Sequence, residues 1–339
     1  MMIKTFYGVE IADIMKIRDK KSYGVSAAAA KGDSIETYCA GSGRFGQDFP
    51  VNPDMLFQAG SVSKPAFAAT LLRYVDKGII DLDADISGVV PEFIRMPMTF
   101  PALLSHTAGF NVHGFPGYRA DADPLTLEDV LAGRGNTPKL RRIKPYGKQY
   151  SYSGGGITLA ELAFTRITGV TLREAFAKEI AAPLGLTRSG YFQPLDEDKA
   201  GSAAFGGRLG IREDSERGWH YYPEHAAAGL WTTPSELVKL GIALSRSLRE
   251  GGLLSKKTAE RMMTPVMDNY GLCVSVRETE TGIPAAGHGG WNEGFLTNWS
   301  FSLTEDLSIA VMYNRSATPA SKRIEKIGTE LFKNASGAQ

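Results

Sequence analysis

Stretches with the residue pattern of β-strands lie near both ends of this chain, and helical patterns fill the region between them. Near the N-terminus, two short runs on either side of Lys31-Gly32-Asp33 predict a β-hairpin, although the alanines of the first run have low β-propensity. Near the C-terminus, β-forming residues alternate or cluster at 271–277, 294–303 and 307–313. We therefore expect an α+β fold in which both termini build one sheet and a mostly helical domain is inserted.

Apolar residues at helical spacing place the predicted helices. They are expected at 9–18, 157–168, 171–180, 233–248 and 320–332. We divide the chain into an α/β domain of residues 1–70 and 230–339 and an inserted helical domain of residues 71–229.

Composition argues against several classes of partner. Lys plus Arg number 38 against 37 for Asp plus Glu, so no net field attracts nucleic acid. No apolar stretch is long enough to span a membrane, and residues 1–6 open no secretory signal, so a cytoplasmic protein is expected. Two cysteines, Cys39 and Cys273, match no metal or redox spacing and are expected as buried free thiols, with a single bridge as the alternative.

Neither a metal nor a cofactor is expected. The five histidines are scattered without the paired spacing of a metal site. An acidic run at Asp81–Ile86 lacks the glycine and the glutamate that a calcium-binding loop requires.

Ser61 and Lys64 lie at the start of a predicted helix, three residues apart and on one face. A serine hydroxyl becomes a strong nucleophile when a neighbouring group takes its proton, and a lysine amine does so if burial lowers its pKa. The positive end of the helix dipole favours negative charge at the serine. About one Ser-x-x-Lys pattern is expected by chance in a chain of this composition, so further motifs must decide.

Five stretches together resemble one family. They are Gly60–Lys64, Leu103–Gly109, Tyr150–Gly156, Gly229–Thr233 and Gly287–Gly290. In order and spacing they resemble the serine β-lactamase and penicillin-binding-protein-like hydrolases, in the branch of class C β-lactamases, D-amino-acid peptidases and related esterases. The resemblance implies a β-lactamase/transpeptidase-like fold, with an antiparallel sheet flanked by terminal helices and the active site between the two domains.

The resemblance also implies roles for individual residues. Ser61 corresponds to the nucleophile, Lys64 to its close partner, and Tyr152 to a tyrosine whose hydroxyl meets both groups. A phenol in this position relays a proton, and a nearby ammonium would favour its phenolate form. Whether Lys64 or Tyr152 is the working base stays open.

A third motif, at residues 288–291, is expected to form a strand edge that binds substrate. Gly289 and Gly290, with His288 before them, are the substrate-binding residues, since missing side chains let a substrate backbone approach. The N–H of Trp291, with that of Ser61, is expected to form the oxyanion hole.

The chain departs from the family pattern at two positions. Gly154 stands where the second motif usually ends in Asn, so a substrate amide must be contacted from elsewhere. His288 replaces the lysine of most β-lactamases, which predicts a group that titrates near neutrality. We expect His106 to have a structural role, and the loop Asp214–Tyr222 to cover the rim of the cleft.

The function implied is that of a serine hydrolase acting through an acyl-enzyme on an ester, amide or lactam carbonyl. Gly154 and His288 favour a carboxylesterase or D-amino-acid peptidase, acting on a small-molecule or short-peptide substrate. A β-lactamase, a penicillin-recognising binding protein without turnover and an acyltransferase on the same scaffold are the alternatives. The oligomeric state does not follow from the sequence.

Overall fold

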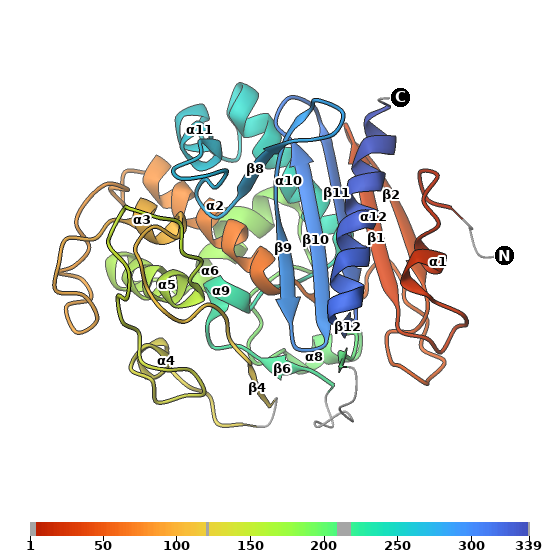
Figure 1. Ribbon diagram of the computed structural model, residues 1–339, viewed down its shortest axis with the longest axis horizontal. Coiled ribbons are helices and arrows are strands. Elements are labelled where there is room, and N and C mark those ends of the chain that lie inside the picture. Colours follow the sequence, from red (N-terminus) through yellow and green to blue (C-terminus); the bar gives the residue numbers. More distant parts are fainter. Residues whose placement is uncertain (1–4, 120–121, 209–217, 338–339) are drawn as a thin grey trace.

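The centre of the fold is a six-stranded antiparallel sheet (Figure 1). The computed structural model describes residues 5–119, 122–208 and 218–337. In spatial order the strands are β2 (Ser34–Ala40), β1 (Val25–Lys31), β11 (Leu307–Tyr313), β10 (Phe295–Ser302), β9 (Pro284–Asn292) and β8 (Ser275–Glu278). Because β1 pairs with β11, the two ends of the chain share one sheet, and this prediction is confirmed.

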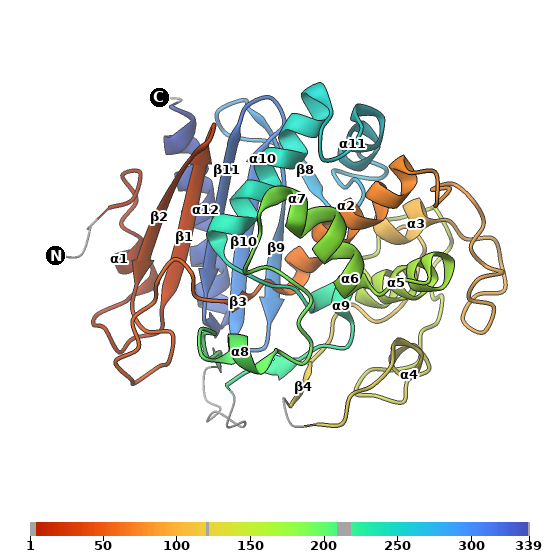
Figure 2. The same cartoon turned by 180° about the vertical axis from the view of Figure 1, so that it is seen from behind.

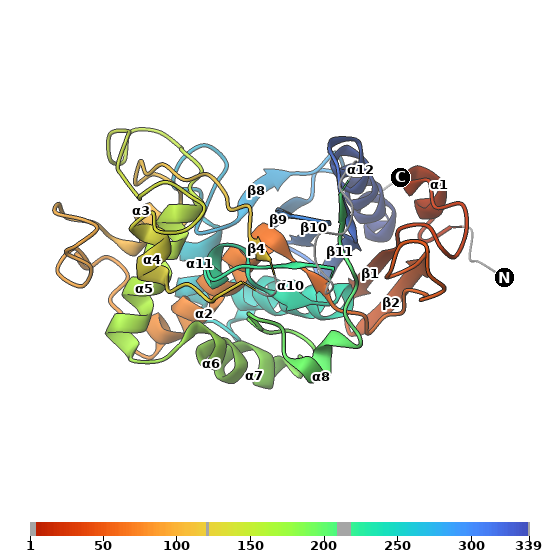
Figure 3. The ribbon, with the colours of Figure 1, turned by 90° about the horizontal axis from the view of Figure 1, so that it is seen from below.

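Helices cover both faces of the sheet (Figures 2 and 3). On one face α12 (Thr318–Ser336) packs on β10 and β11, with α1 (Ile11–Met15) beside it. On the other face α10 (Pro234–Glu250) crosses β1, β11 and β10. The alanines of β1 therefore lie in two apolar clusters, one on each side, and burial between helices overrides their low β-propensity.

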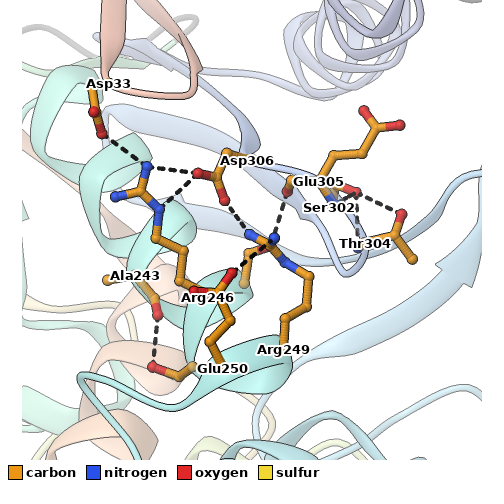
Figure 4. Close-up of polar contacts among 11 residues, drawn as sticks. Asp33, Ala243, Arg246, Arg249, Glu250, Ser302, Thr304, Glu305 and Asp306 are labelled. Carbon is orange, nitrogen blue, oxygen red and sulfur yellow. Dashed lines mark hydrogen bonds and ion pairs between the residues drawn. The ribbon is translucent and has the colours of Figure 1, made fainter.

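The last turns of α10 are tied to the sheet by a network of ion pairs (Figure 4). Arg246 donates to Asp306 at 2.7 Å and to Asp33 at 2.8 Å, and Arg249 also pairs with Asp306. Asp306 lies in the turn between β10 and β11, and Asp33 lies in the turn between β1 and β2. The network thus joins both terminal parts of the chain through one helix.

The helical region adjoins the edge of the sheet that β9 and β8 form (Figure 1). One apolar cluster extends from this region onto the inner face of the sheet. Besides α2 and α5, described below, the helices of this region are α3 (Phe100–Leu104), α4 (Leu127–Leu131), α6 (Leu172–Phe176), the π-helical turn Ala177–Ala181, α7 (Ala182–Leu184), α8 (Glu197–Ala200), α9 (His225–Ala228) and α11 (Lys256–Met263). The remaining short strands are β4 (Tyr118–Arg119), β5 (Gly207–Arg208), β6 (His220–Tyr221), β7 (Trp231–Thr232) and β12 (Arg315–Ser316), of which β12 lies against β10 and α12. The division at residues 70 and 230 stays a prediction.

Two sequence expectations differ from the structure. The strand predicted at 271–277 begins only at Ser275, because Cys273 has a φ of +62° that breaks extended pairing. The helix predicted at 9–18 is limited to α1, which ends where Lys16 takes a φ of +59°. Cys39 and Cys273 are free thiols, as expected, but only Cys273 is buried, and Cys39 is partly exposed. Among the described residues, every helix is too short or too polar to span a bilayer.

Candidate active site

Ser61 lies in a 3-10 turn, Gly60–Val62, that leads from strand β3 (Phe57–Gln58) into helix α2 (Ser63–Asp76). Gly60 has a φ of +55°, and a Cβ added there would lie 2.6 Å from the backbone nitrogen of Trp291. Only glycine fits this conformation and this close approach. The turn that carries Ser61 is therefore held directly against β9.

The structure brings together the three side chains that the motifs single out. Lys64 Nζ donates to Ser61 Oγ at 2.9 Å, and Tyr152 OH donates to the same oxygen at 2.9 Å. Lys64 Nζ also donates to the Ala227 carbonyl of α9 at 2.7 Å. Tyr152 comes from the segment just before α5 (Gly154–Thr168), so the site is assembled from three separate parts of the chain.

Burial sets the charge of Lys64 and of Tyr152. It lowers the pKa of Lys64 to about 7, so a large fraction of the amine is uncharged at neutral pH. Burial raises the pKa of the Tyr152 phenol above its usual value, and this outweighs the hydrogen bond to Ser61. The expectation that a neighbouring ammonium favours the phenolate is therefore wrong, because desolvation dominates at Tyr152.

His288 lies on β9 with its ring between Tyr270 and the backbone. Its Nε2 is 3.0 Å from Tyr270 OH, and its Nδ1 is 2.5 Å from the Gly289 carbonyl. Burial, and then the charge of Lys64, lower the pKa of His288 to about 4. The prediction that His288 titrates near neutrality is thus wrong, and the imidazole is uncharged at physiological pH.

The edge of β9 beyond Gly287 is free of a neighbouring strand among the described residues. Strand β8 pairs with β9 from Pro284 to Gly287 only, which leaves residues 288–292 open on that side. A Cβ at Gly290 would lie 2.0 Å from the Ala59 carbonyl, so a glycine is required there. At Gly289 the nearest atom is 3.9 Å away, so this glycine is not required by packing.

A cavity of about 850 Å³ opens over this edge. Its wall contains the predicted residues Ser61, Tyr152, His288, Gly289, Gly290 and Trp291. Residues without a predicted role also line it, chiefly His113, Phe115, Tyr150, Arg277, Asn298 and Glu325. Tyr150 begins the Tyr150–Gly156 stretch, but no motif marks the others, because they come from the loop at 113–115, strands β8 and β10, and α12.

Asn292, at the end of β9, is a further residue that the sequence does not reveal. Its buried Nδ2 donates to Gln58 Oε1 at 2.9 Å and to the Ala228 carbonyl at 3.0 Å. These bonds tie β9 to β3 and to α9, whose neighbouring carbonyl of Ala227 binds Lys64. Asn292 therefore fixes the strand end next to Trp291.

The expected structural role of His106 is confirmed. Its Nδ1 accepts a hydrogen bond from the Ser153 N–H at 3.2 Å, and its ring lies 4.3 Å from the Tyr152 ring. The loop expected to cover the rim is only partly visible, because 214–217 lie outside the described residues. Its remainder, 218–222, does not line the cavity.

Comparison with known proteins identifies the family. The beta-lactamase family model matches residues 11–330, nearly the whole chain. The chain belongs to the beta-lactamase family. Among the described residues, no cluster of three His, Cys, Asp or Glu side chains could hold a metal ion.

Relatives within the family carry the names of esterases. Lovastatin esterase from Penicillium rubens is 26% identical over 63% of this chain and 60% of its own length. Esterase EstB from Burkholderia gladioli is 26% identical over 52% of this chain and 48% of its own length. The chain thus spans between about half and three fifths of the length of these curated relatives.

Solved structures confirm the fold. The D-amino acid amidase from Ochrobactrum anthropi SV3, complexed with L-phenylalanine amide, superposes with a TM-score of 0.78. It is 20% identical and covers 96% of this chain and 97% of its own. The β-lactamase/transpeptidase-like architecture predicted from the sequence is therefore the one observed.

Proposed function

We propose that this protein is a serine hydrolase that forms an acyl-enzyme on Ser61 and acts on esters of uncharged acyl groups. The observation that carries the proposal is the convergence of Lys64 Nζ and Tyr152 OH on Ser61 Oγ at the wall of an open cavity. A serine hydroxyl that is hydrogen-bonded to an amine with a lowered pKa can lose its proton to that amine, and this activates the serine as a nucleophile.

The charge states of Lys64 and Tyr152 indicate which group accepts and which group donates a proton in each step. Uncharged Lys64 accepts the proton of Ser61 as Oγ bonds to the substrate carbonyl, and Tyr152 remains a neutral donor to that oxygen. The N–H groups of Ser61 and Trp291 are our candidates for stabilising the oxyanion that forms. Lys64 then returns its proton, through the Tyr152 hydroxyl, to the departing alcohol, and water releases the acyl group from Ser61.

The neutrality of the cavity beside Ser61 supports an ester over a β-lactam as substrate. The rings of Tyr152, His288 and Phe115 are uncharged there, because burial holds the His288 imidazole neutral. The charged side chains of the cavity, Arg277 and Glu325, come from β8 and α12 instead. A β-lactam carries a carboxylate near its reactive carbonyl, and a fixed cation would be expected to pair with it.

Burst kinetics with p-nitrophenyl acetate tests the proposal. We expect a burst of one p-nitrophenolate per chain followed by sustained turnover, and both should be lost in Ser61→Ala. A burst without turnover would favour the penicillin-recognising alternative. Faster acyl release on addition of an alcohol or amine acceptor would favour an acyltransferase.

A further inference from the structure

The space that the family's asparagine would occupy at position 154 is already filled. A Cβ added to Gly154 would lie 2.7 Å from the Phe115 ring and 3.1 Å from the His113 carbonyl. A longer side chain at this position would displace the loop that carries both residues. The missing amide is therefore replaced by a neighbouring loop, and the glycine makes room for it.

This loop is fixed to the first turn of α5. The N–H groups of Gly154 and Gly155 donate to the carbonyls of His113 and Val112, each at 3.0 Å. Ser153 Oγ donates to the Asn111 carbonyl at 2.6 Å. The first N–H groups of a helix have no partner inside the helix, so these bonds satisfy donors that would otherwise be unpaired. The loop is thereby held rigidly beside Tyr152.

Val112, the residue before His113, has an unfavourable backbone conformation. Its φ is +60°, in the left-handed region that β-branched residues rarely adopt. Backbone strain of this kind persists where the surroundings enforce it, and it gathers at functional sites. The residue that this strained turn presents is His113.

The His113 imidazole is exposed on the wall of the catalytic cavity. Its ring lies 4.8 Å from the Tyr152 ring, at an interplanar angle of 43°. Within the described part of the chain, neither of its ring nitrogens has a hydrogen-bond partner. Imidazole nitrogens form hydrogen bonds, so both are available to a molecule in the cavity.

We propose that His113 binds a hydrogen-bonding group of the substrate's acyl chain, such as an amide next to the carbon that bears the scissile carbonyl. The inference rests on the proposed hydrolase function. The contact with the Tyr152 ring places the imidazole on the cavity wall that Ser61 also lines, where it would contact the part of the substrate that stays on Ser61. His113 thus sets a preference for polar acyl chains over purely apolar ones.

Two esters of similar length test the proposal, p-nitrophenyl N-acetylglycinate and p-nitrophenyl pentanoate. The quantity compared is the ratio of their kcat/KM values, corrected for spontaneous hydrolysis, so that the intrinsic reactivities cancel between variants. His113→Phe keeps a ring against Tyr152 and removes both nitrogens. His113→Gln keeps a donor and an acceptor and removes the ring.

We expect His113→Phe to lower the ratio by roughly five- to tenfold, as for the loss of one hydrogen bond, because kcat/KM falls more for the N-acetylglycinate than for the pentanoate. His113→Gln should retain most of the wild-type ratio. An unchanged ratio in His113→Phe would overturn the proposal, and this includes an equal loss of kcat/KM with both esters. Failure of the wild type to hydrolyse either ester would instead refute the hydrolase function, and this proposal with it.

Discussion

Lys64 Nζ lies 2.9 Å from Ser61 Oγ, and its other hydrogen bond is to a backbone carbonyl, that of Ala227. A carboxylate partner would hold the amine in its charged form, whereas here burial lowers its pKa to about 7. The amine can therefore act as a base near neutral pH while the Tyr152 phenol keeps its proton.

The pH dependence of hydrolysis follows from this pKa. Below about pH 7 the ammonium cannot accept the proton of Ser61, so we expect kcat/KM for a neutral ester to rise with pH and level off above it. His288 should add no step in this range, because its pKa is about 4. A profile measured from pH 5 to 9 checks this, and a plateau that extends down to pH 5 would contradict it.

Removing the Tyr152 hydroxyl separates its role from that of its ring. Tyr152→Phe keeps the ring next to His106 and His113 but removes the donor to Ser61 Oγ. We expect kcat to fall by about 10²-fold or more, with an unfolding midpoint close to that of the wild type. Activity within a few-fold of the wild type would show that Tyr152 carries no proton in the reaction.

Two adjacent glycines provide a matched pair of substitutions. Gly290→Ala places a Cβ 2.0 Å from the Ala59 carbonyl, so the strand or the turn before Ser61 must shift. We expect it to cost about 1–3 kcal/mol of unfolding free energy and to impair hydrolysis. Gly289→Ala has free space and should change stability by less than about 0.5 kcal/mol. Urea unfolding of both variants checks this, and equal effects would count against the geometry of the β9 edge.

Glu224, a buried carboxyl at the N-terminus of α9, predicts how stability depends on pH. Burial raises the pKa of Glu224 to about 8, and both of its carboxyl oxygens are without a hydrogen-bond partner within the described residues. The folded protein keeps this proton while the unfolded chain releases it above its usual pKa. Each such carboxyl therefore lowers the unfolding free energy by roughly 1.4 kcal/mol per pH unit as the pH rises towards 8.

Glu224→Gln should remove this dependence, because an amide does not titrate. Between pH 5 and 8 we expect the unfolding free energy of the variant to fall less steeply with pH than that of the wild type. The difference between the two slopes should be that of one carboxyl group. Denaturant unfolding at several pH values measures both slopes. Parallel slopes for the two proteins would show that Glu224 is ionised in the folded state.

Short-range rules place two of the three candidate site residues, Ser61 and Lys64. Ser61 and Lys64 are three residues apart at a helix start, so they share a face whatever the rest of the chain does. The sheet formed by both termini is also predictable, since its last two strands have clear β patterns and its hairpin surrounds the turn at Gly32, although the alanines of β1 have low β-propensity. Tyr152 required the resemblance, because its contact with Ser61 spans 91 residues.

Long-range packing decides what the sequence does not reveal. Strand β9 contains three glycines and no alternating pattern, and it is a strand because β10 pairs along its length. The lowered pKa of His288 depends on burial beside Tyr270, which no local pattern reveals. His113 reaches the cavity through a strained turn at Val112, so its place could not be inferred from its neighbours.

Covalent trapping of the nucleophile tests the central claim most directly. The wild-type protein is treated with a fluorophosphonate probe, and the modified peptide is identified by mass spectrometry, with Ser61→Ala treated in parallel. We predict a single adduct on Ser61 that forms faster as the pH rises through 7 and is absent from the variant. An adduct on another residue, or labelling that persists in Ser61→Ala, would contradict the account.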